Sequence, residues 1–203
     1  MRAVLFPGQG SQYVGMGSDF YEKYDDVKKI FDTVDKTLGF SLSKIILSGP
    51  EEDLKLTQNT QPAIMTIGVS IFKVLNQQYN FNLNDSKFFA GHSLGEYTAL
   101  VCSGSLTLEQ AAYLLHERGK AMQEAVPQGH GSMIAVLGMT IDEVEKEISL
   151  LQKKGICEIA NDNSNSQVVV SGEKIVIDAL NANLKMKKKK ELFYQLAHRF
   201  IVH

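Results

Sequence analysis

Residues 91–95 read Gly-His-Ser-Leu-Gly and follow the short apolar run Phe88 to Ala90. This is the G-x-S-x-G pattern, in which a strand delivers a serine, a tight turn exposes it and a helix begins directly after. Flanking glycines keep Cβ atoms away from the strained turn. The following segment, Leu94 to Cys102, is apolar with small residues, as a buried helix should be. The pattern predicts that Ser93 is a catalytic nucleophile; the alternative is a structural turn.

Arg118 is a second candidate, on a helix predicted over residues 108–125 and opened by a capping box at Thr107–Gln110. At about 100° per residue it shares one face with apolar residues. These are Ala111, Leu114, Leu115, Met122 and Ala125. An arginine inside an apolar stripe is costly unless an anion meets it, and its planar donors suit a carboxylate. An external carboxylate, a structural ion pair with a buried Asp or Glu, and snorkelling to the surface all remain open.

The loop Gly8-Gln9-Gly10-Ser11-Gln12 follows a predicted buried strand, residues 3–6. Its glycines allow close backbone approach, but it lacks the spacing and the Lys-Ser/Thr pair of a phosphate-binding loop. It could supply one N–H group of an oxyanion hole, with a second from Leu94, the residue after the proposed nucleophile. The alternative is a plain turn.

A serine nucleophile needs a base, and the chain has five histidines: His92, His116, His130, His198 and His203. His92 is a poor base because neighbouring side chains on such a turn diverge. His116 is expected to face solvent on its helix, together with Glu109, Glu117, Lys120 and Glu124. None of the five stands in a convincing context for a base.

Composition bounds the class of protein. The 203 residues are 44% hydrophobic and 22% charged, as in ordinary soluble domains, and the net charge of −2 gives no reason to expect nucleic acid as a partner. Two cysteines make neither a disulfide framework nor a metal-ligand spacing. The first apolar stretch is too short for a signal peptide or a membrane span. We therefore expect a cytoplasmic protein without metal or membrane association.

The first part of the chain, residues 1–127, has the pattern of an α/β fold with a parallel sheet. The expected elements are strand 3–6, a polar helix through about residue 37, a buried apolar helix at about 62–79 with Pro62 in its first turn, strand 87–90, and helices 94–102 and 108–125.

The second part, residues 128–196, has a different pattern. We expect strand 133–137, a helix capped at Thr140, strand 156–160, a polar turn 161–166, strand 167–171, a helix with Ile177, Leu180 and Leu184 on one face, and a sixth strand near 190–196. This order predicts a ferredoxin-like βαββαβ unit. Residues 197–203 are expected to be an unmatched, loosely held tail.

Five segments together carry a resemblance: residues 6–12, 60–63, 91–97, 117–123 and 167–172. In this order they resemble the malonyl-CoA:acyl-carrier-protein transacylases of bacterial fatty-acid synthesis, over residues 1 to about 188. The resemblance implies an α/β-hydrolase-like large subdomain with a ferredoxin-like small subdomain.

The resemblance also implies roles. Ser93 would take a malonyl group from coenzyme A as an ester and pass it to the phosphopantetheine thiol of acyl carrier protein. Arg118 would pair with the free malonyl carboxylate, and the N–H groups of Gln9 and Leu94 would hold the oxyanion. The further substrate-binding residues are His92, Gln61, Met122 and Asn163. No cofactor is implied beyond malonyl-CoA as substrate, and a monomer is expected.

The C-terminus departs from the family. Family members are longer and carry, soon after the last strand of the small subdomain, a Pro-x-His segment whose histidine is the base; residues 191–203 do not match it. Lys187 to Lys190 imply an adenine run, and we hypothesise a frameshifted, truncated product, incomplete in both subdomains, impaired in activity and with an exposed apolar sheet edge. A divergent C-terminus, a non-catalytic remnant and a serine esterase or thioesterase remain alternatives. A buried Arg118 argues against the esterase, because apolar acyl chains need no cation.

Overall fold

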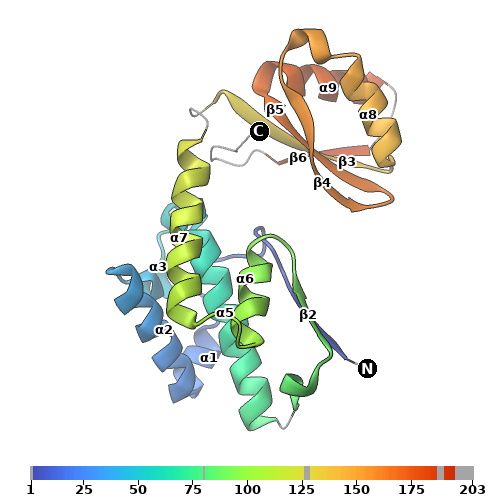
Figure 1. Cartoon of the computed structure of the whole chain (residues 1–203). Helices are drawn as coiled ribbons and strands as arrows, with labels where there is room; N and C mark the ends of the chain where they lie inside the picture. The colour runs from blue at the N-terminus through green and yellow to red at the C-terminus, as the bar shows by residue number, and fades with distance from the viewer. Residues whose placement is uncertain (1, 80, 126–128, 187–189, 195–203) are drawn as a thin grey trace. The chain divides into compact units, whose positions relative to one another are not determined.

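The computed structural model describes residues 2–79, 81–125, 129–186 and 190–194. The chain divides into two compact units, residues 1–121 and 122–203 (Figure 1). The expected boundary after residue 127 and the expected tail, residues 197–203, lie outside the described residues.

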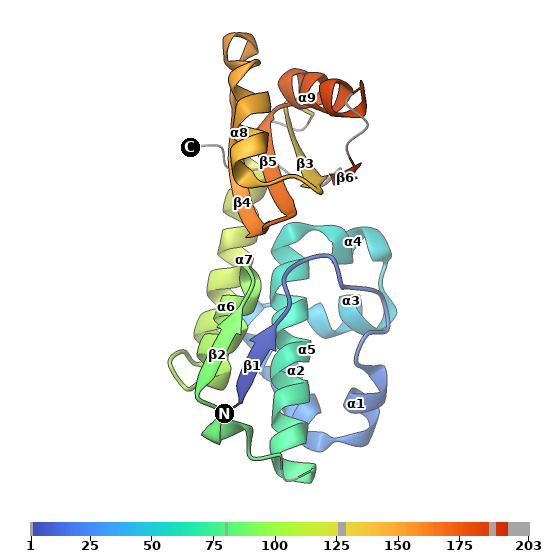
Figure 2. The ribbon, with the colours of Figure 1, turned by 90° about the vertical axis from the view of Figure 1, so that its right-hand side faces the viewer.

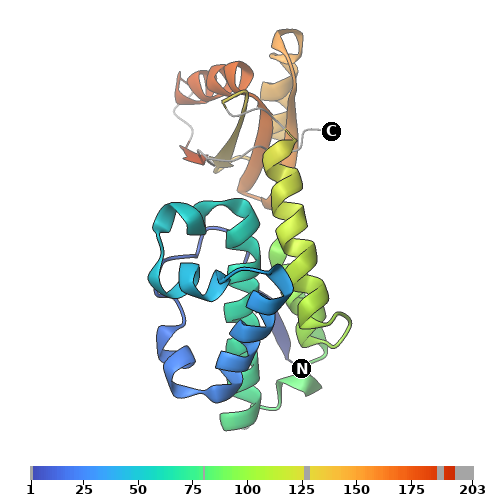
Figure 3. The same ribbon diagram turned by 90° about the vertical axis from the view of Figure 1, so that its left-hand side faces the viewer.

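The first unit is mixed α/β. In chain order its elements are β1 (Ala3–Phe6), α1 (Ser18–Lys23), α2 (Asp25–Leu38), α3 (Leu42–Ser48), α4 (Glu51–Lys55), α5 (Thr57–Gln78), the 3-10 turn η1 (Leu83–Asp85), β2 (Phe88–Gly91), α6 (Leu94–Cys102) and α7 (Leu108–Glu124). Figure 3 shows α2 and α3, in blue, beside α5, against which both pack. Each of these three helices contributes fully buried apolar side chains to one core, among them Phe31, Leu42 and Met65.

β1 and β2 form a parallel pair in which Ala3 lies opposite Phe88 and Phe6 opposite Gly91 (Figure 2). Both strands contact α6. Parallel strands are normally covered on both faces, and the sequence predicts a buried strand at residues 3–6. The prediction of burial is wrong for Leu5, which is 74% exposed, because the helices of the described residues cover the β1–β2 pair incompletely.

α5 begins earlier than expected. It starts at Thr57, so Pro62 is its sixth residue and not in its first turn. Side-chain bonds extend the helix backwards: Asn59 Nδ2 donates to the Asp53 carbonyl at 2.9 Å, and Thr60 Oγ1 donates to the Leu54 carbonyl. The expected burial of this helix is confirmed for its first half.

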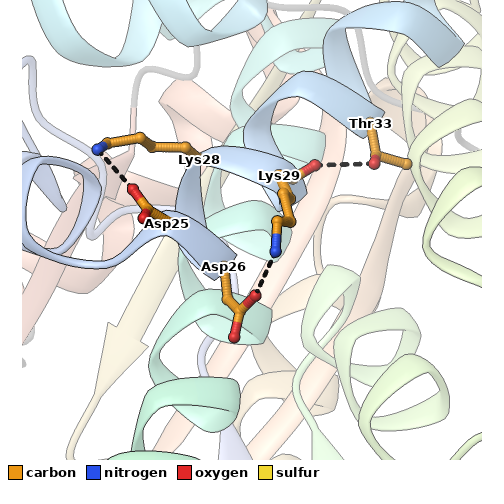
Figure 4. Close-up of polar contacts among 5 residues, drawn as sticks. All are labelled: Asp25, Asp26, Lys28, Lys29 and Thr33. Carbon is orange, nitrogen blue, oxygen red and sulfur yellow. Dashed lines mark hydrogen bonds and ion pairs between the residues drawn. The ribbon is translucent and has the colours of Figure 1, made fainter.

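The single helix expected up to residue 37 is two helices. Tyr24 is extended (φ −122°, ψ 117°) and ends α1, and α2 begins directly after it. The first turn of α2 is acidic, which suits the positive end of the helix dipole. Figure 4 shows how that turn is paired: Asp25 with Lys28 at 2.9 Å and Asp26 with Lys29 at 3.0 Å. In the next turn, the Thr33 hydroxyl donates to the Lys29 carbonyl at 2.8 Å.

The second unit contains a four-stranded antiparallel sheet with strand order β4-β5-β3-β6. Its elements are β3 (Gly131–Leu137), α8 (Ile141–Ser149), the 3-10 turn η2 (Gln152–Lys154), β4 (Cys157–Ser164), β5 (Gln167–Glu173), α9 (Lys174–Met186) and β6 (Lys190–Tyr194). The element order and the strand order confirm the ferredoxin-like βαββαβ unit, including its sixth strand. β4 runs through most of the expected polar turn, residues 161–166, because it pairs with β5 as far as Ser164 opposite Gln167.

The capping box of α8 gives a first prediction. Thr140 Oγ1 accepts from Glu143 N, and Glu143 Oε2 accepts from Thr140 N at 2.9 Å. Thr140→Ala removes one of these bonds and is expected to lower the free energy of unfolding by about 1 kcal/mol. Ser149→Ala at the other end of α8 is the control and should change it by less than about 0.5 kcal/mol. Urea unfolding followed by circular dichroism measures both, and equal effects would contradict the capping role.

Candidate active site

The strand–turn–helix around Ser93 is present as the pattern predicts. β2 ends at Gly91 and α6 begins at Leu94. Ser93 has φ 55° and ψ −114°, and within the described ranges it is the only non-glycine residue with positive φ. Such a backbone costs about 1–3 kcal/mol and persists only where its surroundings enforce it. The turn leaves the Ser93 side chain exposed at the end of β2.

The glycines on either side of Ser93 are required by close packing. A Cβ at Gly91 would lie 1.9 Å from the carbonyl carbon of Gly95, and a Cβ at Gly95 would lie 2.4 Å from the Phe6 carbonyl oxygen. The His92 N–H donates to the same Phe6 oxygen at 3.1 Å. The start of α6 therefore lies directly against the ends of both strands, which fixes the direction in which Ser93 projects.

One side chain from another helix reaches Ser93, and a second side chain contacts the first. Arg118 of α7 donates from Nη2 to Ser93 Oγ at 3.0 Å, and its Nη1 donates to Gln61 Oε1 of α5. Gln61 itself is fully buried. The structure thus brings together three of the residues predicted for the site, from three separate parts of the first unit.

Arg118 has no carboxylate partner in the part of the chain that the structure describes. The structural ion pair left open by the sequence is therefore absent from these residues. The guanidinium is half-buried, and two of its donors are aimed at neutral oxygens beside the exposed serine. A cation in this position is suited to an anionic group that enters next to Ser93.

The buried face of α7 differs from the expected one. It consists of Ala111, Ala112, Leu115, His116 and Gly119. Leu114, expected inside, is 43% exposed, and His116, expected in solvent, is 9% exposed. Arg118 accordingly lies beside the buried face and not at its centre. The helix is rotated because His116 has a polar partner inside: its Nδ1 lies 2.9 Å from the Gln58 carbonyl oxygen of α5.

The two residues predicted to hold an oxyanion come from two separate segments of the first unit. Leu94 is the first residue of α6, where backbone N–H groups have no partner within the helix. Gln9 is half-buried in the loop after β1, in which the Gly10 N–H donates to Gln12 Oε1 at 2.9 Å. The oxyanion roles of Gln9 and Leu94 stay predictions.

The remaining predicted substrate-binding residues differ in surroundings. His92 is exposed, and a Cβ at Gly8 would lie 2.6 Å from its Nδ1. Asn163, on β4, donates from Nδ2 to Gln167 Oε1 at 3.2 Å. Met122 belongs, with Asn163, to the second unit. The substrate-binding roles of all three stay predictions.

No histidine is hydrogen-bonded to Ser93 Oγ in the residues that the structure describes. The group that contacts this oxygen is the Arg118 guanidinium, which has only hydrogen-bond donors and cannot act as a base. The tail histidines His198 and His203, which we expect not to reach Ser93, lie outside the described residues.

The two thiols are poor competing nucleophiles. Burial raises the pKa of Cys102 to about 12, and burial with the nearby Glu158 carboxylate raises that of Cys157 to about 11. Because the thiolate is the reactive form, a raised pKa leaves almost none at neutral pH.

We therefore expect iodoacetamide to alkylate neither cysteine of the native protein at neutral pH, with reactivity rising only as the pH approaches the raised pKa values. The same chain in denaturant should react at both positions, which serves as the control. Intact-mass spectrometry counts the adducts, and rapid stoichiometric alkylation of native Cys102 would contradict this expectation.

Among the described residues, no group of three or more His, Cys, Asp or Glu side chains is placed to bind a metal ion. In the same residues, no helix combines the length and the apolarity needed to cross a bilayer.

Comparisons with known proteins agree with this fold. The sequence model described as "Acyl transferase domain" matches residues 4–195. The malonyl CoA-acyl carrier protein transacylase of Bacillus subtilis is 42% identical over 171 residues, 84% of this chain and 53% of the relative. The crystal structure of the transacylase of that name from Clostridium perfringens superposes with a TM-score of 0.88 at 37% identity, over 97% of this chain and 61% of that one.

A third similar structure is a malonyl-transacylase in complex with its type II PKS acyl-carrier protein, with a TM-score of 0.89 and 36% identity over 97% of this chain and 63% of that one. The chain thus spans between half and two thirds of the length of these proteins. The likeness covers both units and agrees with the α/β-hydrolase-like first unit and the ferredoxin-like second unit.

Proposed function

Because this chain belongs to the acyl transferase domain family, we propose that it transfers a malonyl group from coenzyme A to the phosphopantetheine thiol of acyl carrier protein through an ester on Ser93. The observation that carries the proposal is the contact of Arg118 Nη2 with Ser93 Oγ at 3.0 Å. This contact places a cation beside a strained and exposed serine. Among the described residues, that cation has no carboxylate partner. The reaction needs no cofactor, because malonyl-CoA brings its own activated thioester.

In the first step, Ser93 Oγ attacks the thioester carbonyl and the carbon–sulfur bond breaks. Coenzyme A leaves as a thiol with the proton that Ser93 loses, and a malonyl ester remains. In the second step, the thiol of the carrier protein attacks this ester, forms the new thioester and returns a proton to Ser93 Oγ. Backbone N–H groups of Gln9 and Leu94 would stabilise the oxyanion in both steps.

Arg118 selects the acyl group in this proposal. It would move from Gln61 and Ser93 onto the free malonyl carboxylate, since two parallel N–H donors match a carboxylate better than two neutral oxygens. A serine esterase or thioesterase, which handles uncharged acyl chains, has no use for this cation. Acylation of this chain should be slow. Arg118 cannot serve as the base for Ser93, and the loss of a catalytic base commonly lowers the rate by several orders of magnitude.

The test incubates the chain with malonyl-CoA and acyl carrier protein and follows three products: malonyl-Ser93, malonyl carrier protein and free malonate. Carrier protein without its phosphopantetheine arm is the control, since it has no thiol to accept the group. We expect malonyl carrier protein only when the carrier protein bears its phosphopantetheine arm. With the Ser93→Ala variant, neither the chain itself nor the carrier protein should become malonylated.

The other outcomes are distinct. Malonyl-Ser93 that decays to free malonate with both carrier proteins would identify a hydrolase and overturn the transfer step. A folded chain that forms no malonyl protein of either kind over many hours would overturn the proposal for this chain.

A further inference from the structure

α5 contains a defect in its hydrogen bonding close to the candidate site. Pro62 is the sixth residue of this helix. In a regular α-helix, the carbonyl of residue 58 accepts the N–H of residue 62, and proline has none. The Gln58 carbonyl therefore lacks its helical donor, one turn before Gln61.

The donor comes from α7. His116 Nδ1 lies 2.9 Å from the Gln58 carbonyl oxygen. A carbonyl oxygen only accepts, so the proton of this bond is on Nδ1. The imidazole is 9% exposed and lies against Phe40, with 5.4 Å between ring centroids.

The next turn of α7 touches the same residue. A Cβ at Gly119 would lie 2.3 Å from Gln58 Cα, so the absent side chain lets the backbones of the two helices meet there. His116 and Gly119 thus hold α7 against α5 at Gln58. Arg118 lies between them in the sequence and makes its own bond to Gln61, one turn further along α5.

We propose that His116 is a positioning residue: by replacing the donor that Pro62 lacks, it fixes the register of α7 on α5 and so aims Arg118 at Gln61 and Ser93. In this account the proline and the histidine form one device, and neither touches the acyl group. Its effect on malonyl binding rests on the proposed function, whereas the hydrogen bond itself does not.

The variants separate the bond from the bulk of the ring. His116→Phe keeps an aromatic ring against Phe40 but has no donor. His116→Asn keeps a donor at the position of Nδ1. Pro62→Ala supplies a backbone N–H for Gln58, so the double variant Pro62→Ala/His116→Phe should not need the histidine.

Two readouts are followed, the thermal midpoint and the affinities for malonyl-CoA and acetyl-CoA by titration calorimetry. We expect His116→Phe to lower the midpoint by about 4 °C. We expect it to weaken malonyl-CoA binding by about two- to thirtyfold, with acetyl-CoA binding unchanged. His116→Asn and the double variant should recover most of both losses.

Different outcomes would overturn the positioning role of His116 and the proposed function. Equal losses for malonyl-CoA and acetyl-CoA in His116→Phe, or a double variant no better than His116→Phe, would overturn the positioning role; this second comparison holds even if His116→Phe alone does not fold. If the unaltered chain shows no preference for malonyl-CoA, the proposed function fails instead. The bond is then tested by the midpoints and by the His116 Nδ1–H resonance, which the proposal expects to be protected from exchange.

Discussion

Ser93→Ala is expected to reduce malonyl labelling of this chain by about a thousandfold or more, to the level of the uncatalysed reaction. The substitution keeps Cβ and the turn, so it removes the attacking oxygen and leaves the fold intact. Both thiols are held as unreactive acids by raised pKa values, so neither can take over. Intact-mass spectrometry after timed incubation with malonyl-CoA measures the rate.

Ser103→Ala, just after the other end of α6, is the matched control and should label at the rate of the unaltered chain. Labelling of Ser93→Ala at that same rate would show that another group is acylated, and the assignment of the nucleophile would be wrong.

Arg118→Ala is expected to weaken malonyl transfer by about tenfold to several hundredfold while leaving acetyl transfer nearly unchanged, since a charge-assisted bidentate pair contributes a few kcal/mol. The malonyl transfer rate of Arg118→Lys should lie between those of the unaltered chain and Arg118→Ala, because a lysine keeps the charge but loses the paired donors of the guanidinium. The measurement is the ratio of labelling rates with malonyl-CoA and acetyl-CoA for each variant.

Lys120→Ala is the control on the same helix, where an exposed lysine pairs with Glu117 at 2.8 Å. Its malonyl-to-acetyl ratio should not change. An unchanged ratio in Arg118→Ala would place Arg118 among residues that only support the fold.

The sequence predicted the elements whose signals are local. The turn around Ser93 follows from two glycines and a serine between a strand and a helix. The capping boxes at Thr107 and Thr140 are both formed, with the Gln110 N–H donating to Thr107 Oγ1 at 3.1 Å. The two capping boxes satisfy their hydrogen bonds within four residues, so their formation depends little on distant contacts.

The sequence-based predictions are wrong where a contact with a residue distant in the sequence determines the burial of a side chain or the start of a helix. The helical pattern predicts His116 on the polar face of α7, yet it is buried because Pro62 leaves the Gln58 carbonyl without its helical donor. The sequence predicts Pro62 in the first turn of its helix, yet α5 begins five residues earlier, where side-chain bonds join it to the preceding segment. A proline inside a helix does carry a signal, since it implies a carbonyl four residues earlier that needs another donor. A histidine on a facing helix is a suitable source.

The central claim is that Ser93 carries the malonyl group. The most direct measurement digests the unaltered chain after incubation with malonyl-CoA and locates the adduct by tandem mass spectrometry. The account predicts one malonyl ester, on Ser93, that disappears when acyl carrier protein with its phosphopantetheine arm is added. A malonyl group on Cys102 or on a lysine, or transfer to the carrier protein with no ester on Ser93, would contradict it.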